Sequence, residues 1–364
     1  MNATGGALLI YGANGYTGRL VVKRAVSVGL KPILCGRNTA EISAIAGQHG
    51  LEFRIASLGD PASLDAALAG CSVVIHSAGP FSRTSKPMVD ACIRNRVHYL
   101  DITGEISVFE SLASSARSAE ARAAGIMLLP GAGFDVVPSD CLAAHLKRRL
   151  PSATWLTLAF SGGTGLSRGT ATTMLENVAR GGAIRRGGKI TRVPAAWRQR
   201  DIDFGDRTRH VVTLPWGDVS TAFHSTGIPN IEVYTAATPA TIRGMIVSRY
   251  SGWLLATKPM QSFFKDAIKK SGPAGPSDAQ RASTVARLWG EAWDDDGNKV
   301  VSRLKTLDGY TLTALAAVAA AEKVLAGGTK PGFQTPSLAF GADFILEIPG
   351  SEREDVTVTK EPSR

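Results

Sequence analysis

Residues Ala7–Tyr11 read ALLIY and run directly into Gly12–Gly18, GANGYTG, after which an apolar helical pattern begins. The apolar run is typical of a buried strand. Three glycines in G-x-x-G-x-x-G spacing let the chain turn sharply, bring backbone N–H groups against a pyrophosphate, and pack the next helix tightly on the sheet. The stretch predicts a dinucleotide-binding turn with the phosphates at a helix N-terminus. The alternative is a glycine-rich loop without a ligand.

The end of the second strand predicts which dinucleotide binds. That strand reads Pro32–Cys35 and is followed by Gly36, Arg37 and Asn38. An acid at this point normally binds the ribose hydroxyls of NAD, whereas a cation suits the extra phosphate of NADP. Because an arginine stands here and no carboxylate does, NADP is favoured over NAD. The alternative is that Arg37 is an ordinary surface arginine.

Apolar runs then alternate with helical patterns, as in a doubly wound parallel sheet. We therefore expect a Rossmann domain of six parallel strands over residues 1–150. The further strands are expected at 52–56, 72–76, 98–101 and 126–129, with helices at 61–69, 86–95 and 108–124. Ligands bind beyond the carboxyl ends of such strands, so the residues after each strand are the candidate site.

From about Pro151 the pattern changes to strands with fewer helices. We expect a second, α+β domain for substrate binding or dimerisation over 151–310, with strands at 155–160, 211–214 and 230–237. Asp294–Asn298 predicts a hairpin between strands 283–293 and 299–306. A helix over 311–325 and the C-terminal segment are expected to pack on the first domain, and the tail from Ser351 to be frayed.

The chain has 364 residues, 44% of them apolar, and a net charge of +10, which favours anionic ligands such as NADP or acyl-CoA and does not by itself indicate nucleic acid. The cluster of basic residues over 180–209 is expected to be a solvated loop.

No apolar run reaches the roughly 20 residues of a membrane-spanning helix. No secretory signal is evident, so a cytoplasmic location is expected. The histidines and cysteines show no metal-binding spacing.

Several stretches agree with one family: YGANGYTGR, CGRN, SAGPF, YLDITGE and GAGFDVVPSD. The chain resembles the saccharopine dehydrogenase-like oxidoreductases. Two later stretches, SGGTGLSRGTATTMLE and GFQTPSLAFGADF, look like the bacterial branch that includes trans-acting enoyl reductases. The resemblance covers most of the chain and implies an enzyme that uses NADP(H). A homodimer is expected.

Carried over by position, the resemblance implies phosphate contacts and a nicotinamide-side loop. The expected phosphate-binding residues are Gly12, Asn14, Gly15, Tyr16, Thr17 and Gly18. Recognition of the NADP phosphate falls to Arg37, flanked by Gly36 and Asn38. The nicotinamide half is expected to lie along Ala78, Gly79, Pro80 and Phe81.

Hydride transfer needs orientation, exclusion of water and a group that supplies a proton. The candidates for this role near the strand ends are Asp101, Glu105, Asp135, Ser139 and Tyr16, with Tyr99 as a further hydroxyl donor. Arg168 is the candidate anchor for a substrate carboxylate or phosphate. Two structural alternatives stay open: Ser139 as a helix N-cap, and Asp101 as the holder of a neighbouring loop.

Three functions remain open. The first is an NADPH-dependent reductase of a carbonyl or enoyl group on an apolar or thioester-linked substrate, with the aromatic segment 250–264 near the entrance. The second is a saccharopine-type enzyme that makes a secondary amine from an amino acid and an aldehyde. The third is a non-catalytic NADP(H)-binding regulator.

Overall fold

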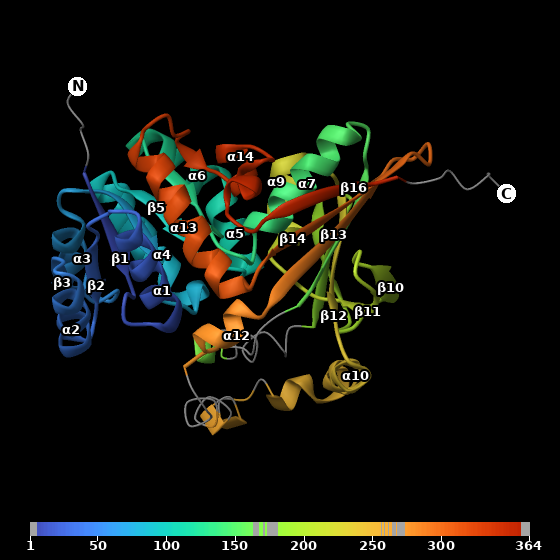
Figure 1. Cartoon of the computed structure of the whole chain (residues 1–364), viewed down its shortest axis with the longest axis horizontal. Coiled ribbons are helices and arrows are strands. Elements are labelled where there is room, and N and C mark those ends of the chain that lie inside the picture. The colour runs from blue at the N-terminus through green and yellow to red at the C-terminus, as the bar shows by residue number, and fades with distance from the viewer. Residues whose placement is uncertain are drawn as a thin grey trace. The chain divides into compact units, whose positions relative to one another are not determined.

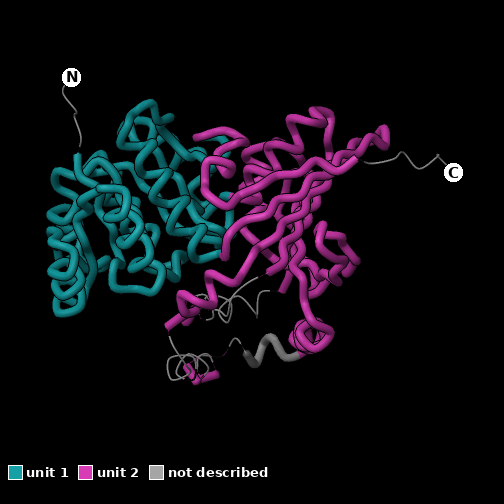
Figure 2. The backbone as a smooth tube through the Cα atoms, viewed as in Figure 1, with its two compact units in different colours: residues 1–137, 309–339 teal, residues 138–308, 340–364 magenta. Residues whose placement is uncertain are grey.

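The computed structural model describes residues 6–162, 167–169, 172, 181–255, 257, 259–260, 262–263, 267 and 274–357, and for 251–255 it describes the backbone only. The chain divides into two compact units, which Figure 2 shows in different colours. The first comprises residues 1–137 and 309–339. The second comprises residues 138–308 and 340–364.

The first unit is a doubly wound parallel sheet, as the sequence predicts. Its strand order is β15-β6-β5-β4-β1-β2-β3, and all neighbouring pairs are parallel. The strands are β1 (Ala7–Tyr11), β2 (Ile33–Gly36), β3 (Phe53–Ile55), β4 (Cys71–His76), β5 (His98–Asp101), β6 (Met127–Leu129) and β15 (Gly332–Phe333). The helices of this part are α1 (Tyr16–Ser27), α2 (Thr39–His49), α3 (Pro61–Leu68), α4 (Phe81–Asn95), α5 (Ile106–Ala113), α6 (Ser115–Ala124), α13 (Gly309–Leu325) and α14 (Pro336–Phe340).

The expected count of six strands was wrong, because β15 adds a seventh at the sheet edge. It pairs with β6 in parallel and comes from a distant part of the chain. Helix α13, orange in Figure 1, belongs to the same unit and contacts α1, β4 and β5. The predicted helix 108–124 is in fact two helices, since Ser114 ends α5 and its side chain caps α6.

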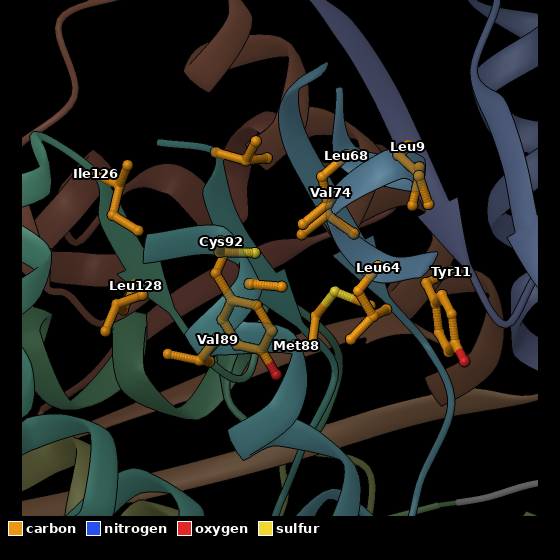
Figure 3. Packing of buried hydrophobic residues seen from close by; sticks show 14 of the residues in the cluster. Leu9, Tyr11, Leu64, Leu68, Val74, Met88, Val89, Cys92, Ile126 and Leu128 are labelled. Atoms are coloured by element: carbon orange, nitrogen blue, oxygen red, sulfur yellow. The ribbon is translucent and has the colours of Figure 1, made fainter. Parts of the chain in front are cut away.

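Apolar side chains of the alternating strands and helices form one core on a face of this sheet. Figure 3 shows Leu9 and Tyr11 of β1 and Val74 of β4 lying among side chains from α3 and α4. Such burial contributes about 25 cal/mol for each Å² of apolar surface removed from water. This burial fixes the positions of the strands. It therefore also fixes where the loops at their carboxyl ends begin.

The second unit is built on a mixed sheet of nine strands, which agrees with the α+β prediction. The strand order is β10-β11-β12-β7-β13-β14-β16, with β8 paired to β12 and β9 paired to β8. The strands are β7 (Trp155–Ser161), β8 (Gly182–Arg186), β9 (Lys189–Val193), β10 (Gln199–Asp203), β11 (Thr208–Thr213), β12 (Asn230–Ala236), β13 (Val285–Trp293), β14 (Lys299–Leu307) and β16 (Glu352–Val356). The helices are α7 (Val137–Arg149), α9 (Asp218–Thr226), α10 (Pro239–Leu255), α12 (Asp278–Ala282) and the 3-10 helix η1 (Phe344–Glu347).

Two expectations about this part of the chain were wrong. The basic segment was expected to be a solvated loop, but residues 182–213 contain four strands, β8 to β11. The tail from Ser351 was expected to be frayed, but β16 pairs with β14. There His145 Nε2 lies 2.8 Å from Asp355 Oδ1, and Ser302 donates to the same oxygen over 2.7 Å. These long-range contacts have no local signal in the sequence.

Candidate cofactor site

The glycine turn joins β1 to α1 and is shaped by two close backbone approaches. Gly12 has φ +81°, and a Cβ there would lie 2.9 Å from the Cβ of Ala78. A Cβ on Gly18 would lie 2.2 Å from the carbonyl oxygen of Gly12. Helix α1 starts at Tyr16, and Gly15 at its N-cap has no side chain that could cap it, so the helix N-terminus can receive an anion. This geometry fits a dinucleotide pyrophosphate.

The loop after β4 lies directly beside that turn. The Ser77 hydroxyl donates to the carbonyl oxygens of Tyr11 at 2.8 Å and of Gly12 at 3.3 Å. The following peptide bond between Gly79 and Pro80 is cis. The structure therefore brings the two predicted cofactor-binding stretches, 12–18 and 78–81, to one edge of the sheet.

An exposed arginine, Arg37, follows β2. Arg37 is exposed and, within the described part of the chain, forms no hydrogen bond or ion pair. Its neighbour Asn38 caps α2 by accepting from the Glu41 N–H at 3.3 Å. A planar guanidinium of this kind can bind a phosphate dianion through two parallel hydrogen bonds.

A carboxylate close to this strand end was not predicted from the sequence. Glu41 accepts hydrogen bonds from the side-chain amides of Asn14 at 2.9 Å and Asn38 at 2.7 Å. These two asparagines were expected at the cofactor, and the structure directs both amides to Glu41. The Asn38–Glu41 spacing is typical of a helix N-terminus, and this capping pattern is the sequence signal that could have predicted the position of Glu41.

Asp101 and Glu105 hold the backbone of the site. Asp101 is fully buried, and it accepts from the Tyr99 hydroxyl at 2.7 Å and from the N–H groups of Thr103 and Gly131 at 3.0 and 2.9 Å. Burial nevertheless raises the pKa of Asp101 to about 6. Glu105 accepts from two N–H groups at the start of α4. These bonds favour the structural alternative for Asp101 and give Glu105 a capping function.

Asp135 is the candidate acid whose environment suits proton transfer. It follows β6, is half-buried, and packs against Gly104, where a Cβ would lie 2.9 Å from Asp135 Oδ2. Loss of solvation raises the pKa of Asp135 from 3.8 to about 7. A carboxyl that is partly protonated at neutral pH can donate a proton. Asp135 also lies beyond the carboxyl end of a strand, where such sheets bind ligands.

Tyr16 and His76 complete the polar groups of this edge. The Tyr16 ring meets Tyr310 of α13 edge-on, with the ring centroids 5.1 Å apart, and Tyr310 was not foreseen. His76 ends β4 and is fully buried between aromatic rings, including those of Tyr11 and Phe81, each 5.4 Å away. Burial lowers the pKa of His76 to about 3, so this imidazole is neutral.

The remaining candidates belong to the second unit. The structural alternative of Ser139 as a helix N-cap is wrong, because α7 starts at Val137 and the Ser139 hydroxyl donates to Asp218 Oδ1 at 2.6 Å. Arg168 is exposed, and its backbone N–H donates to the carbonyl of Ala274. Within segment 250–264, residues 256, 258, 261 and 264 lie outside the described residues, and residues 251–255 are described for the backbone only. In the described portion, Tyr250 is 79% exposed and Phe263 is 67% exposed.

No helix in the described part of the chain is long and apolar enough to cross a bilayer. Among the described residues, the histidine, cysteine, aspartate and glutamate side chains form no group of three that could hold a metal ion.

Comparison with known proteins agrees with this geometry. Residues 12–124, within the first unit, match the family described as NAD(P)H-binding, and the parallel sheet of this unit has the Rossmann-like strand order. Over 150 residues, 39% of the chain, the sequence is 31% identical to a trans-acting enoyl reductase of Mycobacterium leprae. Over 149 residues it is 28% identical to a trans-acting enoyl reductase of Mycobacterium tuberculosis. The matches span only 36% and 35% of these relatives.

One solved structure shares the fold across nearly the whole chain. It is the saccharopine dehydrogenase (L-Glu forming) of Saccharomyces cerevisiae, with a TM-score of 0.67, 14% identity, and coverage of 97% of this chain and 100% of that one. At this identity the likeness establishes the fold. Residues 12–124 thus match an NAD(P)H-binding family, and the chain is similar in fold to saccharopine dehydrogenase and, in part of its sequence, to trans-acting enoyl reductases.

Proposed function

We propose that the protein is an NADP(H)-dependent reductase of a carbonyl or enoyl group on an apolar or thioester-linked substrate. The observation that carries the proposal is the position of Asp135. This carboxyl follows a strand of the NAD(P)H-binding sheet and has a pKa raised to about 7. The names of the partial sequence relatives support reduction of an enoyl group.

The preference for NADP(H) rests on Arg37. It is exposed at the end of β2 without a partner in the described part of the chain, whereas Glu41 is held by two asparagine amides. A guanidinium with its donors available favours the additional phosphate of NADP. Glu41, the carboxylate that could bind ribose hydroxyls, is thus already hydrogen-bonded, whereas Arg37 is not hydrogen-bonded to any described residue.

The chain's residues would orient the cofactor and supply a proton. The Gly12–Gly18 turn and the α1 N-terminus would hold the pyrophosphate, and the loop 78–81 would hold the nicotinamide half. Bound NADPH supplies a hydride to the acceptor carbon. Asp135 donates the accompanying proton to the substrate oxygen or α-carbon. Asp101 and Glu105 position the loops without touching the substrate.

The saccharopine-type reaction is the second candidate, and the fold shared over 97% of the chain favours it. The test is NADPH consumption by the purified protein with a panel of trans-2-enoyl thioesters and, separately, with glutamate plus an aldehyde. We expect turnover with the thioesters that is lost in Asp135→Asn. Turnover only with the amine and aldehyde would establish the second candidate. Tight NADPH binding with no turnover on either would contradict both and favour a cofactor-binding regulator.

A further inference from the structure

The second unit holds a polar pocket on one face of its sheet, with a volume of about 470 Å³. Three neighbouring strands form its floor, because Thr157 of β7 lies in register with Glu232 of β12 and with Glu291 of β13. The central threonine is small and the flanking side chains are long, so the row is hollow in its middle. Volumes of this size suit small-molecule ligands.

This pocket occupies the sheet face that points away from α7. Gly290, next to Glu291, faces α7 so closely that a Cβ would lie 2.6 Å from Leu146 and 3.1 Å from Leu142. Side chains of consecutive strand residues point to opposite faces. The Thr157 row therefore faces away from the helix, and the pocket residues come from β7, β10, β12, β13 and β14.

Buried carboxylates hold the cations of the pocket in place. The Glu232 and Glu291 side chains are each only 9% exposed. Glu232 accepts from Arg198 at 3.0 Å and from the Tyr234 hydroxyl at 2.7 Å. Ion pairs joining Glu291 to Arg200 at 3.4 Å and to Lys299 at 3.1 Å anchor the other side. Two carboxylates thus fix three cations around one hollow.

Positive charge remains in excess after these pairings. Arg186 also approaches Glu232, at 3.5 Å, so four cations against two carboxylates leave a net charge of +2. The side chains of Arg198, Arg200 and Lys299 are 52%, 37% and 43% exposed. Each arginine contributes one nitrogen to its carboxylate pair, and a guanidinium has five N–H donors. Like charges this close repel, and a bound anion would relieve the repulsion.

An aromatic wall borders the same hollow. Trp293 lines the pocket and stacks on Trp155, its partner across the strands, with centroids 5.6 Å apart and planes inclined by 7°. The Arg186 guanidinium lies 4.6 Å from the Trp155 ring centroid. Stacking fixes both indoles and leaves a flat apolar surface next to the cations. A ligand with a planar or apolar body could rest on this surface.

We propose that this pocket binds a phosphate monoester, with the dianionic phosphate among Arg198, Arg200 and Lys299 and its organic body against Trp293. The charge of a phosphate monoester at neutral pH, about −1.5 to −2, matches the excess of the cluster. Arg198 lies just before β10, Arg200 lies within it and Lys299 starts β14, so the cations flank the pocket on two sides, which suits tetrahedral oxygens pointing in several directions. A carboxylate, by contrast, presents both oxygens in one plane. The assignment is independent of the proposed reductase activity.

The test is a titration of the full chain with phenyl phosphate, inorganic phosphate and succinate, followed by tryptophan fluorescence. We expect phenyl phosphate to bind more tightly than inorganic phosphate, since only the former reaches Trp293. Arg200→Gln should weaken its binding about tenfold. Lys299→Gln is a second variant in case the first unfolds. Arg207→Gln is the matched control, because it removes the same charge from the exposed β10–β11 turn and should change nothing.

Three results would overturn the proposal. The first is no binding of either phosphate probe to the folded wild-type chain. The second is equal affinity in wild type, Arg200→Gln and Lys299→Gln. The third is succinate binding at least as tightly as phenyl phosphate, which would exclude the phosphate class. Sedimentation should be run in parallel, because a change of oligomeric state in the variants without anion binding would assign this face to contact between copies of the chain.

Discussion

Glu105 Oε1 accepts a 2.7 Å hydrogen bond from the backbone N–H of Phe81, the first residue of α4, and Oε2 accepts one of 3.1 Å from Ser82. The residue at the usual capping position is Pro80, which has no side-chain acceptor. A carboxylate from the loop after β5 therefore caps the helix that follows β4. This one side chain therefore ties the loop after β5 to the loop after β4.

We expect Glu105→Ala to lower the free energy of unfolding by about 1–2 kcal/mol, because two N–H groups of α4 lose their acceptor. Chemical denaturation would measure the difference. Glu322→Ala on α13 is the control, since its side chain makes no hydrogen bond or ion pair within the described residues, and its effect should stay within about 0.5 kcal/mol. Equal effects of the two substitutions would show that Glu105 is not a cap.

Gly18 should not tolerate a methyl group. In Gly18→Ala the new Cβ would meet the Gly12 carbonyl oxygen at 2.2 Å, so α1 must move away from the turn. We expect loss of NADPH affinity by at least tenfold and a lower melting temperature. Gly47→Ala is the matched control, because nothing lies within 4 Å of its Cβ inside α2 and alanine stabilises helix interiors by about 0.5–1 kcal/mol. Wild-type affinity in Gly18→Ala would contradict the tight packing of this turn.

The sequence predicted those elements whose signals are contiguous in the chain. The strand Ala7–Tyr11, its glycine turn and the helix after it are contiguous, and the hairpin around Asp294–Asn298 carries its own turn residues. Pairings that depend on distant partners were not predictable in this way. Strand β15 has two residues, and β16 is a strand only because β14 lies beside it. The interaction of Glu41 with Asn14 likewise joins residues 27 positions apart.

Arg37 should determine the choice between the two nicotinamide cofactors. Arg37→Ala removes the cation after β2, and we expect it to weaken NADPH by about 2 kcal/mol, or roughly thirtyfold, and to leave NADH nearly unchanged. Fluorescence titration with both cofactors would measure the two affinities. Lys31→Ala, which removes an exposed charge before the same strand, should alter neither. An equal loss for both cofactors would remove Arg37 as the selectivity residue.

Asp135 should make turnover fall as the pH rises. Its pKa is raised to about 7, so the donor form predominates below that pH and is lost above it. We expect kcat on an accepted substrate to fall with an apparent pKa near 7, and Asp135→Asn to lower it at least a hundredfold. A pH–rate profile from pH 5 to 9 measures this. A flat profile with full activity in Asp135→Asn would assign the proton to another group.

The same carboxyl should also affect stability, with a sign that follows from its protonation. The folded chain binds this proton more tightly than the unfolded chain, because the pKa is raised on folding. The contribution of Asp135 is therefore complete below about pH 4 and is lost as the pH rises to about 7. Relative to Asp135→Asn, the wild type should lose stability across this interval, as measured by denaturation at each pH. A constant difference would show that the pKa is not raised.

The return of α13 and β15 to the first sheet affects the order in which the protein can fold during synthesis. The ribosome releases β1 to β6 first, yet their sheet lacks its edge strand until residues 332–333 emerge, about two hundred residues later than β6. Until then the surfaces of α1, β4 and β5 that α13 covers stay uncovered. Domains usually fold as units during translation. Here the N-terminal unit is completed only after nearly all of the second unit has been made, so it cannot reach its complete fold while only its own N-terminal residues have emerged.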